Sequence, residues 1–535
     1  RDYNTVDISM PTLYNVYLPS FKAAVDAGVA TFMVSFNEIN GVPSSGNEYL
    51  VRGILKNKWD FQGFVVSDWG SVEEMIDHGF AANGKEAAEL AITAGVDMEM
   101  ATTTYLQHLK GMIEEGEIDE KLLDEAVRRI LKVKFQLGLF EAPYVKDTVS
   151  FDVLEPGHLD IAREAAVQSL VLLKNERRIL PLSRDIKKVF VCGPLADEAY
   201  EQLGTWIFDG ERKHSVTPLH AINDMLGADR VLFDKILTYS RDKDESGFPS
   251  AIVMAKQAGA VIAIVGEESI LSGEAHSRAD ITLPGKQAEL LKTLKSSGKP
   301  VIMVVMAGRP LAMKNVEDYC DAILYAWHPG TMGGIAVAEV LFGERNPSGK
   351  LPVSFPLVSG QEPLYYNHKR TGRPPSSEKF VSIDDMPVNA RQFSFGNTSN
   401  YMDAGYEPAY PFGYGLSYTT FDYSGLTLDR KVLTKKDTLH ISVEVMNTGE
   451  REGTEIVQLY IRDQVGSLTR PVKELKRFQR VFLNPGEKKT LAFFLTYPDL
   501  GFYNNNFQWK VEPGDFTLFV GGSSVDCLEE RFSIE

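Results

Sequence analysis

An aspartate at the end of a short apolar run is the first candidate for chemistry in this sequence. The run reads Gly63-Phe64-Val65-Val66-Ser67-Asp68-Trp69, and residues 64–67 have the composition of a buried strand. If the strand belongs to a parallel barrel, its carboxyl end carries the catalytic groups, so Asp68 is a candidate nucleophile. The alternative is that Asp68 caps a helix expected over residues 71–79. A cap does not need the adjacent indole of Trp69, whereas an apolar ring beside a charged group is typical of sugar-binding sites, so the pattern favours chemistry.

A second group of carboxylates follows another buried run. Residues 261–265 predict a strand of an open α/β sheet, and such sheets place ligands beyond the carboxyl ends of their strands. The loop that follows, residues 266–284, is rich in small and polar residues and contains Glu267, Glu268, Glu274 and Asp280. A glutamate on such a loop is usually a solvated surface group. Glu274, near the middle of the loop, becomes a catalytic candidate only through a partner elsewhere in the chain.

The composition is that of a globular protein with several domains. A chain of 535 residues is too long for one core and suggests about three domains. Its formal net charge of -17 argues against nucleic acid or an anionic membrane surface as a partner, and fits a neutral ligand better. No run of about 18 apolar residues is present, so the sequence predicts no membrane span.

The sequence offers no signature of a metal or cofactor site. Cys192, Cys320 and Cys527 lie far apart and lack metal-ligand spacing, so we expect buried apolar side chains. The sequence has no Gly-x-Ser-x-Gly elbow, no phosphate-binding Gly-x-x-x-x-Gly-Lys and no His-Glu-x-x-His. We therefore expect neither a metal nor an organic cofactor.

Residues 1–142 alternate apolar strands with amphipathic helices, as a parallel α/β architecture does. The expected strands are residues 30–36, 64–67 and 95–100. The expected helices are residues 13–27, 48–58, 85–93, 105–115 and 119–137. A closed barrel needs eight strands and about 200 residues or more. This part is therefore predicted to be the C-terminal part of a (β/α)8 (TIM-like) barrel.

The remainder of the chain predicts a second α/β domain and an all-β domain. Residues 143–158 are predicted to be a linker, and residues 159–360 an α/β sandwich with an open, mostly parallel sheet. Its expected strands are residues 188–192, 261–265, 301–306 and 322–326, and its expected helices include residues 161–173 and 285–296. Residues 361–420 form a long connecting segment packed over other domains. In residues 421–535 apolar residues alternate with polar ones, as in Leu439, Ile441, Val443 and Val445, which predicts an antiparallel β-sandwich.

Taken in order, these stretches resemble glycoside hydrolase family 3, in particular its bacterial β-glucosidases with a C-terminal fibronectin type III-like domain. The resemblance covers essentially the whole chain. It rests on Ser35-Phe36-Asn37 with Asn40-Gly41-Val42-Pro43, Gly63 to Trp69, Leu172-Leu173-Lys174-Asn175, Gly308-Arg309-Pro310, Asn346-Pro347-Ser348-Gly349-Lys350-Leu351-Pro352 and Tyr410-Pro411-Phe412-Gly413-Tyr414-Gly415-Leu416-Ser417-Tyr418-Thr419. Each motif alone is weak, but their order is highly specific.

The resemblance implies roles for individual residues. The aspartate of the family's Ser-Asp-Trp motif is the nucleophile, which matches Asp68, and a glutamate of the second domain is the acid/base, which matches Glu274. Glu268 is the alternative acid/base, and Glu267 is expected to be an orienting or structural carboxylate. Trp69 would form the aromatic wall of the aglycone side.

Two further residues are expected in the sugar pocket. Met33 would line it. Phe36 stands where the family commonly has tyrosine, so a hydroxyl contact near the nucleophile is absent or is supplied by another group.

The activity that the resemblance implies is hydrolysis by a retaining, exo-acting β-glucosidase on β-linked gluco-oligosaccharides. A β-xylosidase or another exo-glycosidase is the alternative within the family, because the contacts around the sugar C6 hydroxymethyl group decide which sugar is bound. His276, close to Glu274, leaves open a phosphorylase or N-acetylglucosaminidase that uses histidine as acid/base. A non-catalytic carbohydrate-binding protein is the alternative from another class.

The family's barrel also has a long N-terminal portion that holds the sugar hydroxyls, and this sequence does not contain it. Either a separate polypeptide supplies that portion or the sequence is a fragment. Arg1-Asp2-Tyr3 is not a natural start, so a processed or truncated product is expected. The resemblance also implies a periplasmic or extracellular location and is compatible with a homodimer.

Overall fold

The computed structural model describes residues 2–145, 154–392 and 396–535. The chain divides into two compact units, Arg1–Asp152 with Phe502–Lys510, and Val153–Gly501 with Val511–Glu535. The sequence pattern did not predict that Phe502–Lys510 joins the first unit. Half of the predicted linker 143–158, residues 146–153, lies outside the described residues, and its last residues begin helix α6 (Pro156–Ser169).

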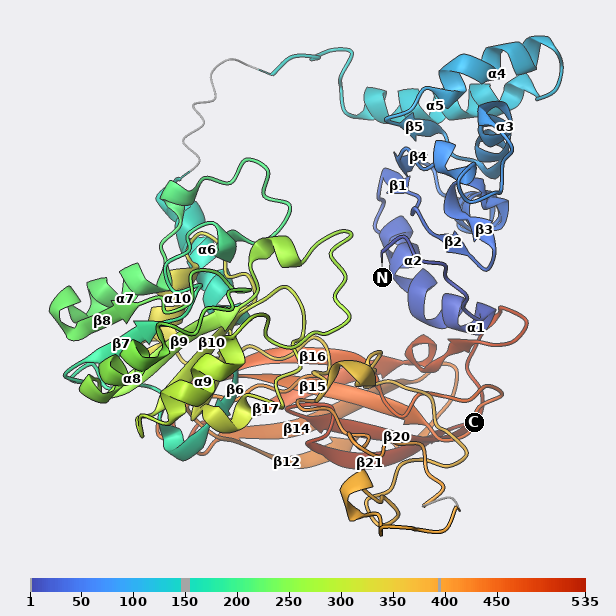
Figure 1. The fold of residues 1–535 in the computed structure, drawn as a ribbon. Helices are drawn as coiled ribbons and strands as arrows, with labels where there is room; N and C mark the ends of the chain where they lie inside the picture. Colours follow the sequence, from blue (N-terminus) through green and yellow to red (C-terminus); the bar gives the residue numbers. More distant parts are fainter. Residues whose placement is uncertain (1, 146–153, 393–395) are drawn as a thin grey trace. The chain divides into compact units, whose positions relative to one another are not determined.

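A three-stranded parallel sheet forms the centre of the first unit (Figure 1). Its order is β1 (Thr31–Met33), β4 (Phe64–Trp69), β5 (Met98–Met100). Thr31 lies opposite Phe64, and Val66 lies opposite Met98. β1 is shorter than predicted, although the Val34 N–H still donates to the Val66 carbonyl at 3.1 Å. β4 is two residues longer than predicted, so Asp68 and Trp69 belong to the strand itself.

Helices connect these strands. Their bounds are α1 (Met10–Thr12), π-helix η1 (Leu13–Tyr17), α2 (Leu18–Asp26), π-helix η3 (Tyr49–Lys58), α3 (Gly84–Ala94), α4 (Thr104–Glu114) and α5 (Glu120–Gln136). The Asn83 side chain caps α3 by accepting from the Glu86 N–H, and Gly95 ends the helix with φ at 102°. Asp119 caps α5 in the same way. Two short strands, β2 (Glu38–Ile39) and β3 (Val42–Pro43), form a hairpin after β1.

The second unit contains a six-stranded sheet of order β6-β11-β10-β9-β7-β8, which is parallel apart from β6. The strands are β6 (Val171–Asn175), β7 (Val189–Cys192), β8 (Val231–Asp234), β9 (Ala260–Gly266), β10 (Val301–Met306) and β11 (Ala322–Tyr325). The predicted helix 161–173 is wrong at its end, because α6 stops at Ser169 and β6 begins at Val171. β8 was not predicted, since its four residues are too few to show a pattern.

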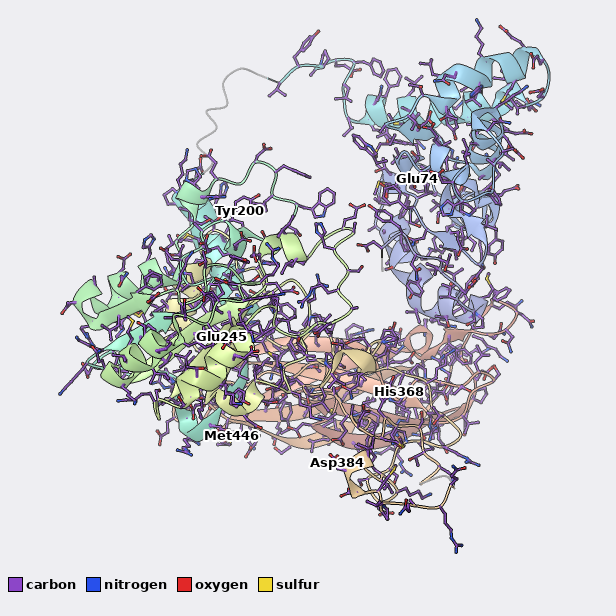
Figure 2. The ribbon with its side chains drawn as sticks, viewed as in Figure 1. Glu74, Tyr200, Glu245, His368, Asp384 and Met446 are labelled. Atoms are coloured by element: carbon purple, nitrogen blue, oxygen red, sulfur yellow. The ribbon has the colours of Figure 1, made fainter. Side chains whose placement is uncertain are left out.

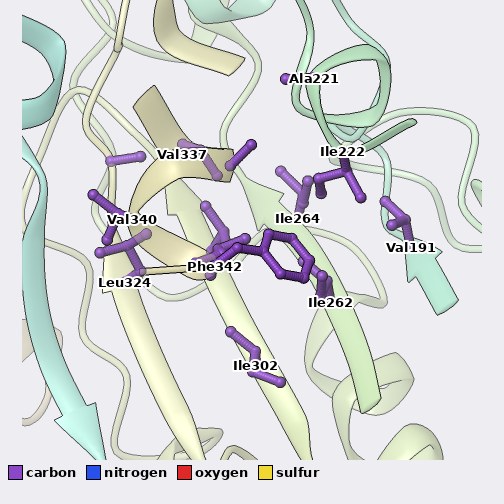
Figure 3. Close-up of a cluster of buried hydrophobic side chains, with 14 of the residues drawn as sticks. Val191, Ala221, Ile222, Ile262, Ile264, Ile302, Leu324, Val337, Val340 and Phe342 are labelled. Carbon is purple, nitrogen blue, oxygen red and sulfur yellow. The ribbon is translucent and has the colours of Figure 1, made fainter. Parts of the chain in front are cut away.

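Helices cover both faces of this sheet. Ile262, Ile264 and Ile302 pack on one face with residues of α6, α7 (Pro218–Leu226) and α10 (Gly333–Leu341), as Figure 3 shows for Val337 and Val340. On the other face, strand residues such as Val261 and Met303 pack with α8 (Phe248–Gln257) and α9 (Gln287–Lys295). The predicted α/β sandwich with a mostly parallel sheet is therefore confirmed.

The C-terminal part of the second unit is a β-sandwich. One sheet has the order β12-β14-β17 and the other β13-β21-β20-β15-β16. The strands are β12 (Phe421–Leu428), β13 (Val432–Leu433), β14 (Thr438–Asn447), β15 (Gly453–Asp463), β16 (Glu474–Leu483), β17 (Lys488–Thr496), β20 (Gly514–Gly521) and β21 (Cys527–Ile534). Leu439, Ile441, Val443 and Val445 are buried between the sheets, as their alternation predicts. The connecting segment packs on this sandwich where Tyr366 stacks on Phe412 and contacts Tyr460.

Candidate active site

Asp68 lies at the carboxyl end of β4, the middle strand of the first unit's sheet. Its side chain is half-buried. Among the described residues its carboxylate accepts one hydrogen bond, from the Trp69 N–H at 2.7 Å. The turn that follows, η4 (Glu73–Met75), has Val72 as its N-cap residue and receives no side-chain cap in the described part of the chain. The capping alternative for Asp68 is therefore wrong.

Ser67 fixes the end of β4 against β5. Its buried Oγ accepts from the Met100 N–H at 2.8 Å and donates to the Asp68 carbonyl at 2.8 Å. The pairing shifts register between Val66 and Trp69, which is a bulge, and bulges redirect side chains next to functional sites. Trp69 remains 70% exposed beside Asp68. The strand end therefore presents a carboxylate and an indole on a rigid support.

The other carboxylates near this sheet have structural partners. Asp97 is buried, accepts from Lys56 at 2.7 Å and from the Val65 N–H at 2.8 Å. Glu99 accepts the N–H groups of Thr104 and Tyr105 at the start of α4. These bonds set Asp97 and Glu99 apart from Asp68, which receives only its neighbour's N–H among the described residues.

Glu74, labelled in Figure 2, is a second carboxyl group of this unit, and the charge of Asp68 influences its pKa. Burial raises the pKa of Glu74, the charge of His78 lowers it, and the carboxylates of Asp77 and Asp68 raise it further, with a net rise. A carboxyl group with a raised pKa keeps its proton to higher pH, which limits charge repulsion with Asp68.

Met33 and Phe36 lie at the carboxyl end of β1. Met33 is 54% exposed and lines a cavity of about 340 Å³ whose other lining residues are mostly apolar. In the described part of this unit, Asp68 is not among the lining residues of that cavity. The Phe36 ring lies edge-on to the Tyr3 ring with 5.1 Å between their centroids. The backbone carbonyl of Phe36 accepts a hydrogen bond from His78 Nε2 at 3.1 Å. The sugar-binding roles of Met33 and Phe36 stay predictions.

Glu274 lies in the second unit, on the loop between β9 and α9. It is half-buried and lines a cavity of about 270 Å³ together with Trp206, Phe208 and His276. Tyr200, labelled in Figure 2, lines the same cavity. Trp206 and Phe208 meet edge-to-face with 5.3 Å between their centroids, and both are largely exposed. The cavity thus combines a carboxyl group with aromatic rings, as sugar sites do.

The other carboxylates of this loop are held by cations or by the backbone. Glu267 is fully buried between Arg278 and Arg309, as expected for a structural carboxylate. Glu268 accepts from Arg241 at 3.0 Å and from the Ser240 hydroxyl at 2.6 Å. Burial raises the pKa of Glu268, but the bonds from Arg241 and Ser240 outweigh it, so the pKa is lowered and the group stays ionised. Glu268 is therefore poorly suited to donate a proton.

Asp280, the fourth carboxylate of the loop, accepts from the Thr282 N–H at 3.0 Å. That bond and one from the Thr282 side chain lower the pKa of Asp280, so it too stays ionised. Among the loop's carboxylates, Glu274 alone lines the 270 Å³ cavity within the described residues.

Several residues of this site were missed by the sequence analysis. Trp206 and Phe208 belong to Gly204-Thr205-Trp206-Ile207-Phe208-Asp209-Gly210, an aromatic loop bounded by glycines. Arg309 lies three residues after the end of strand β10, within the Gly308-Arg309-Pro310 motif. These residues follow parallel strands, and such sheets bind ligands beyond the carboxyl ends of their strands, but the sequence does not give the strand order that makes β7, β9 and β10 neighbours.

The predicted residues divide between the units. Asp68, Trp69, Met33 and Phe36 belong to the first unit, and Glu274 belongs to the second. The described residues contain no group of three or more His, Cys, Asp or Glu arranged to hold a metal ion. Nor does any described helix have the length and apolar character needed to cross a membrane.

Comparison with known proteins places the chain in a family. Residues 1–133 match the glycosyl hydrolase family 3 N-terminal domain, and residues 170–418 match the family 3 C-terminal domain. Residues 455–524 match a fibronectin type III-like domain. These matches agree with the predicted resemblance and with the sandwich described above.

Individual relatives extend along nearly the whole chain. A periplasmic beta-glucosidase of Salmonella typhimurium is 40% identical over 560 residues, which cover 100% of this chain and 71% of that protein. A beta-xylosidase of Formosa agariphila is 38% identical over 537 residues, covering 97% of this chain and 71% of that protein. The crystal structure of a beta-glucosidase from Listeria innocua in complex with isofagomine has a TM-score of 0.93 at 40% identity and covers 100% of this chain and 72% of that one. This chain therefore belongs to glycoside hydrolase family 3 and is a glycoside hydrolase.

Proposed function

We propose that the chain carries the catalytic pair of a retaining, exo-acting β-glucosidase that removes terminal β-D-glucosyl residues from oligosaccharides. The observation that carries the proposal is the end of β4, where Asp68 accepts a hydrogen bond only from Trp69 N–H among the described residues and the Trp69 indole stands exposed beside it. A carboxylate without a neighbouring cation keeps its lone pairs available for attack. An exposed indole offers the flat apolar surface on which a sugar ring packs.

Retention requires two carboxyl groups in different roles, about 5 Å apart. In this proposal Asp68 attacks the anomeric carbon while Glu274 gives its proton to the leaving oxygen, so the glycosidic bond breaks and an ester to Asp68 forms. Glu274, now ionised, then takes a proton from water, which attacks the same carbon and releases Asp68. The two residues belong to different units of the chain.

The aromatic residues beside Glu274 fit the aglycone side of such a site. Trp206 and Phe208 line the cavity that Glu274 lines, so a sugar leaving group bound there would lie next to the proton donor. His276, the alternative acid/base, also lines the cavity, and its Nδ1 lies 3.2 Å from the Ser272 carbonyl oxygen. That bond needs a proton on Nδ1.

A β-xylosidase is the second candidate, because the relative from Formosa agariphila at 38% identity has that name. The glucosidase is preferred because the Salmonella and Listeria proteins are both beta-glucosidases at 40% identity. A location outside the cytoplasm, in the periplasm or the medium, is part of the proposal, since the Salmonella relative is named periplasmic. Fractionation of cells that express the native gene would test that location.

A separate polypeptide that supplies the N-terminal barrel portion is one of the two alternatives left open above, and the first unit has a surface that it could cover. β1 is an edge strand, and the apolar cavity of about 340 Å³ beside it is lined by residues such as Phe21, Phe32 and Ile54. An open parallel edge next to an apolar hollow favours pairing with further strands and helices. We propose that a polypeptide carrying the N-terminal barrel portion covers this surface. Co-expression with that portion of a relative should yield a complex that survives gel filtration, and separate elution would contradict the proposal.

The decisive experiment compares a chromogenic β-glucoside with the matching β-xyloside, using the wild-type chain, Asp68→Ala and the surface control Glu89→Gln. Loss of a nucleophile should lower kcat by at least about 10⁴-fold, whereas the control should match wild type.

Proton NMR of the first product should show the β-anomer. Faster turnover of the xyloside would favour the second candidate, and an α-anomer would refute retention. If the chain alone shows no turnover, the assay is repeated on the complex with the N-terminal portion. Inactivity of that complex would refute the proposal.

A further inference from the structure

A single guanidinium group closes the segment that carries Glu274. Nη2 of Arg309 donates to the carbonyl oxygens of Leu271 and His276, the latter at 2.9 Å. These two residues begin and end a six-residue segment with Glu274 inside it. Nε of Arg309 meanwhile donates to Oε2 of Glu267 at 3.0 Å. One side chain therefore joins both ends of the segment to the end of strand β9.

Glu267 fixes the plane of that guanidinium. It follows β9 directly, is fully buried, and its N–H donates to the Met306 carbonyl at 2.8 Å. Its second oxygen accepts from Arg278. A buried carboxylate must keep its cationic partners, because an unpaired charge there is costly. Glu267 is thus a fixed anchor, and Arg309 has one orientation relative to the sheet.

The backbone of the segment needs such support. Gly273 and Ala275, on either side of Glu274, both have positive φ, at 104° and 62°. The left-handed region is unfavourable for alanine, so surrounding contacts must hold Ala275 there. The Ser272 hydroxyl lies 3.2 Å from Nε2 of His328, which supports the first half of the segment.

The segment that carries Glu274 lies close to the backbone of Gly308, the glycine next to Arg309. A Cβ at Gly308 would lie 2.5 Å from the Ser272 hydroxyl and 2.9 Å from His328 Nε2. No side chain fits there without displacing the segment. The Gly308-Arg309-Pro310 motif therefore both admits the segment and ties its ends.

We propose that Arg309 is a positioning residue for the acid/base: by tying Leu271 to His276 it sets where the Glu274 carboxyl group stands in the cavity. The inference rests on the proposed function of Glu274. A lysine would keep the positive charge, but its single ammonium cannot reproduce the planar fork that binds Glu267 and both carbonyl groups. A positive charge at position 309 is therefore not sufficient to tie the two ends of the segment together.

The test uses two β-glucosides that differ in their need for a proton. 2,4-Dinitrophenolate leaves without protonation, whereas the sugar alcohol released from cellobiose needs it. Arg309→Lys should lower kcat/KM for cellobiose by about 100-fold, as expected for a misplaced catalytic group, and change kcat/KM for the dinitrophenyl glucoside by less than about threefold. Arg278→Lys is the matched control. Arg278 also binds Glu267, but its other bond goes to the Thr282 carbonyl, outside the segment, so both substrates should change by the same factor.

Glu274→Gln separates this inference from the proposed function. If Glu274→Gln lowers kcat/KM for both substrates by the same factor, Glu274 is not the acid/base and the proposed function fails. If Glu274→Gln is selective for cellobiose but Arg309→Lys behaves like Arg278→Lys, the positioning inference alone is overturned. Hydrogen exchange of residues 271–276 gives a readout independent of turnover. It should be at least about tenfold faster in Arg309→Lys than in Arg278→Lys, and equal rates would overturn the inference.

Discussion

Asn15 and Tyr503 exchange two hydrogen bonds although they lie 488 positions apart in the chain. Asn15 Nδ2 donates to the Tyr503 carbonyl at 2.9 Å, and the Tyr503 N–H donates to Asn15 Oδ1 at 2.7 Å. The neighbouring Tyr14 ring stacks on Phe507 with 5.0 Å between centroids. These contacts explain why the hairpin of β18 (Phe502–Tyr503) and β19 (Trp509–Lys510) belongs to the first unit.

Replacing Asn15 by alanine should destabilise the first unit by about 1–2 kcal/mol, because the Tyr503 N–H and carbonyl groups lose their partners. The effect is measured as the urea midpoint of unfolding, with hydrogen exchange of residues 502–510 as the probe. Asn505→Ala in the same hairpin is the control, since Asn505 is exposed. Equal midpoints for the two variants would contradict the prediction.

The Lys56–Asp97 pair should be strongly coupled. Their side chains are each 2% exposed, with 2.7 Å between Nζ and Oδ1. Burial lowers the pKa of Lys56 and raises that of Asp97, so each group depends on the other to stay charged. Lys56→Met should cost about 3–5 kcal/mol, as removal of one member of a buried pair does.

A second-site change tests this coupling. Asp97→Asn in the Lys56→Met background removes the unpaired charge and keeps an oxygen for the Val65 N–H. The double variant should be more stable than Lys56→Met alone in urea unfolding. The exposed pair of Lys22 with Asp26 supplies the control, because Lys22→Met should cost less than about 1 kcal/mol. A double variant less stable than Lys56→Met would refute the coupling.

Glu125 should make the first unit sensitive to acid. Burial raises the pKa of this carboxyl, but hydrogen bonds from Arg52 and Arg129 and the charge of Lys56 lower it from 4.5 to about 2. Because the pKa in the folded state lies below that in the unfolded state, its stabilising effect is complete above pH 4.5 and is lost as the pH falls towards 2. The gap in urea midpoint between wild type and Glu125→Gln should therefore narrow over that range. A gap that does not change with pH would contradict the assignment.

The strand that carries Asp68 could be predicted because Phe64, Val65 and Val66 are consecutive apolar residues, as is typical of strands in parallel sheets, although only Val65 of the three is fully buried. The end of α6 could not be predicted from the sequence. Apolar residues continue from the helix into β6, so the pattern runs on after the backbone has changed from helix to strand. Pairing with β11, which ends the helix, depends on residues about 150 positions away, and the local sequence does not contain them.

The surroundings of Glu274 were hidden for a related reason. Trp206 follows β7, Glu274 follows β9 and Arg309 follows β10, and these three strands are neighbours in the sheet. Their loops meet only because of that strand order. Periodicity locates each strand but does not give the order, so the sequence predicted Glu274 without its partners.

Trp206 provides the last prediction, which rests on the proposed aglycone site. Its ring is 63% exposed and lines the cavity of Glu274, so it contributes little to stability and offers a flat face to a bound sugar. Trp206→Ala should raise KM for cellobiose by about 5- to 30-fold, equivalent to about 1–2 kcal/mol, and leave the unfolding midpoint unchanged. Phe482→Ala, an exposed aromatic residue of β16, is the control and should leave KM unchanged. Because the glycosyl part of the substrate would not touch Trp206, KM for a glucoside with a small leaving group should also stay unchanged. An equal rise in KM for both substrates would show that Trp206 acts through the loop and not through the aglycone.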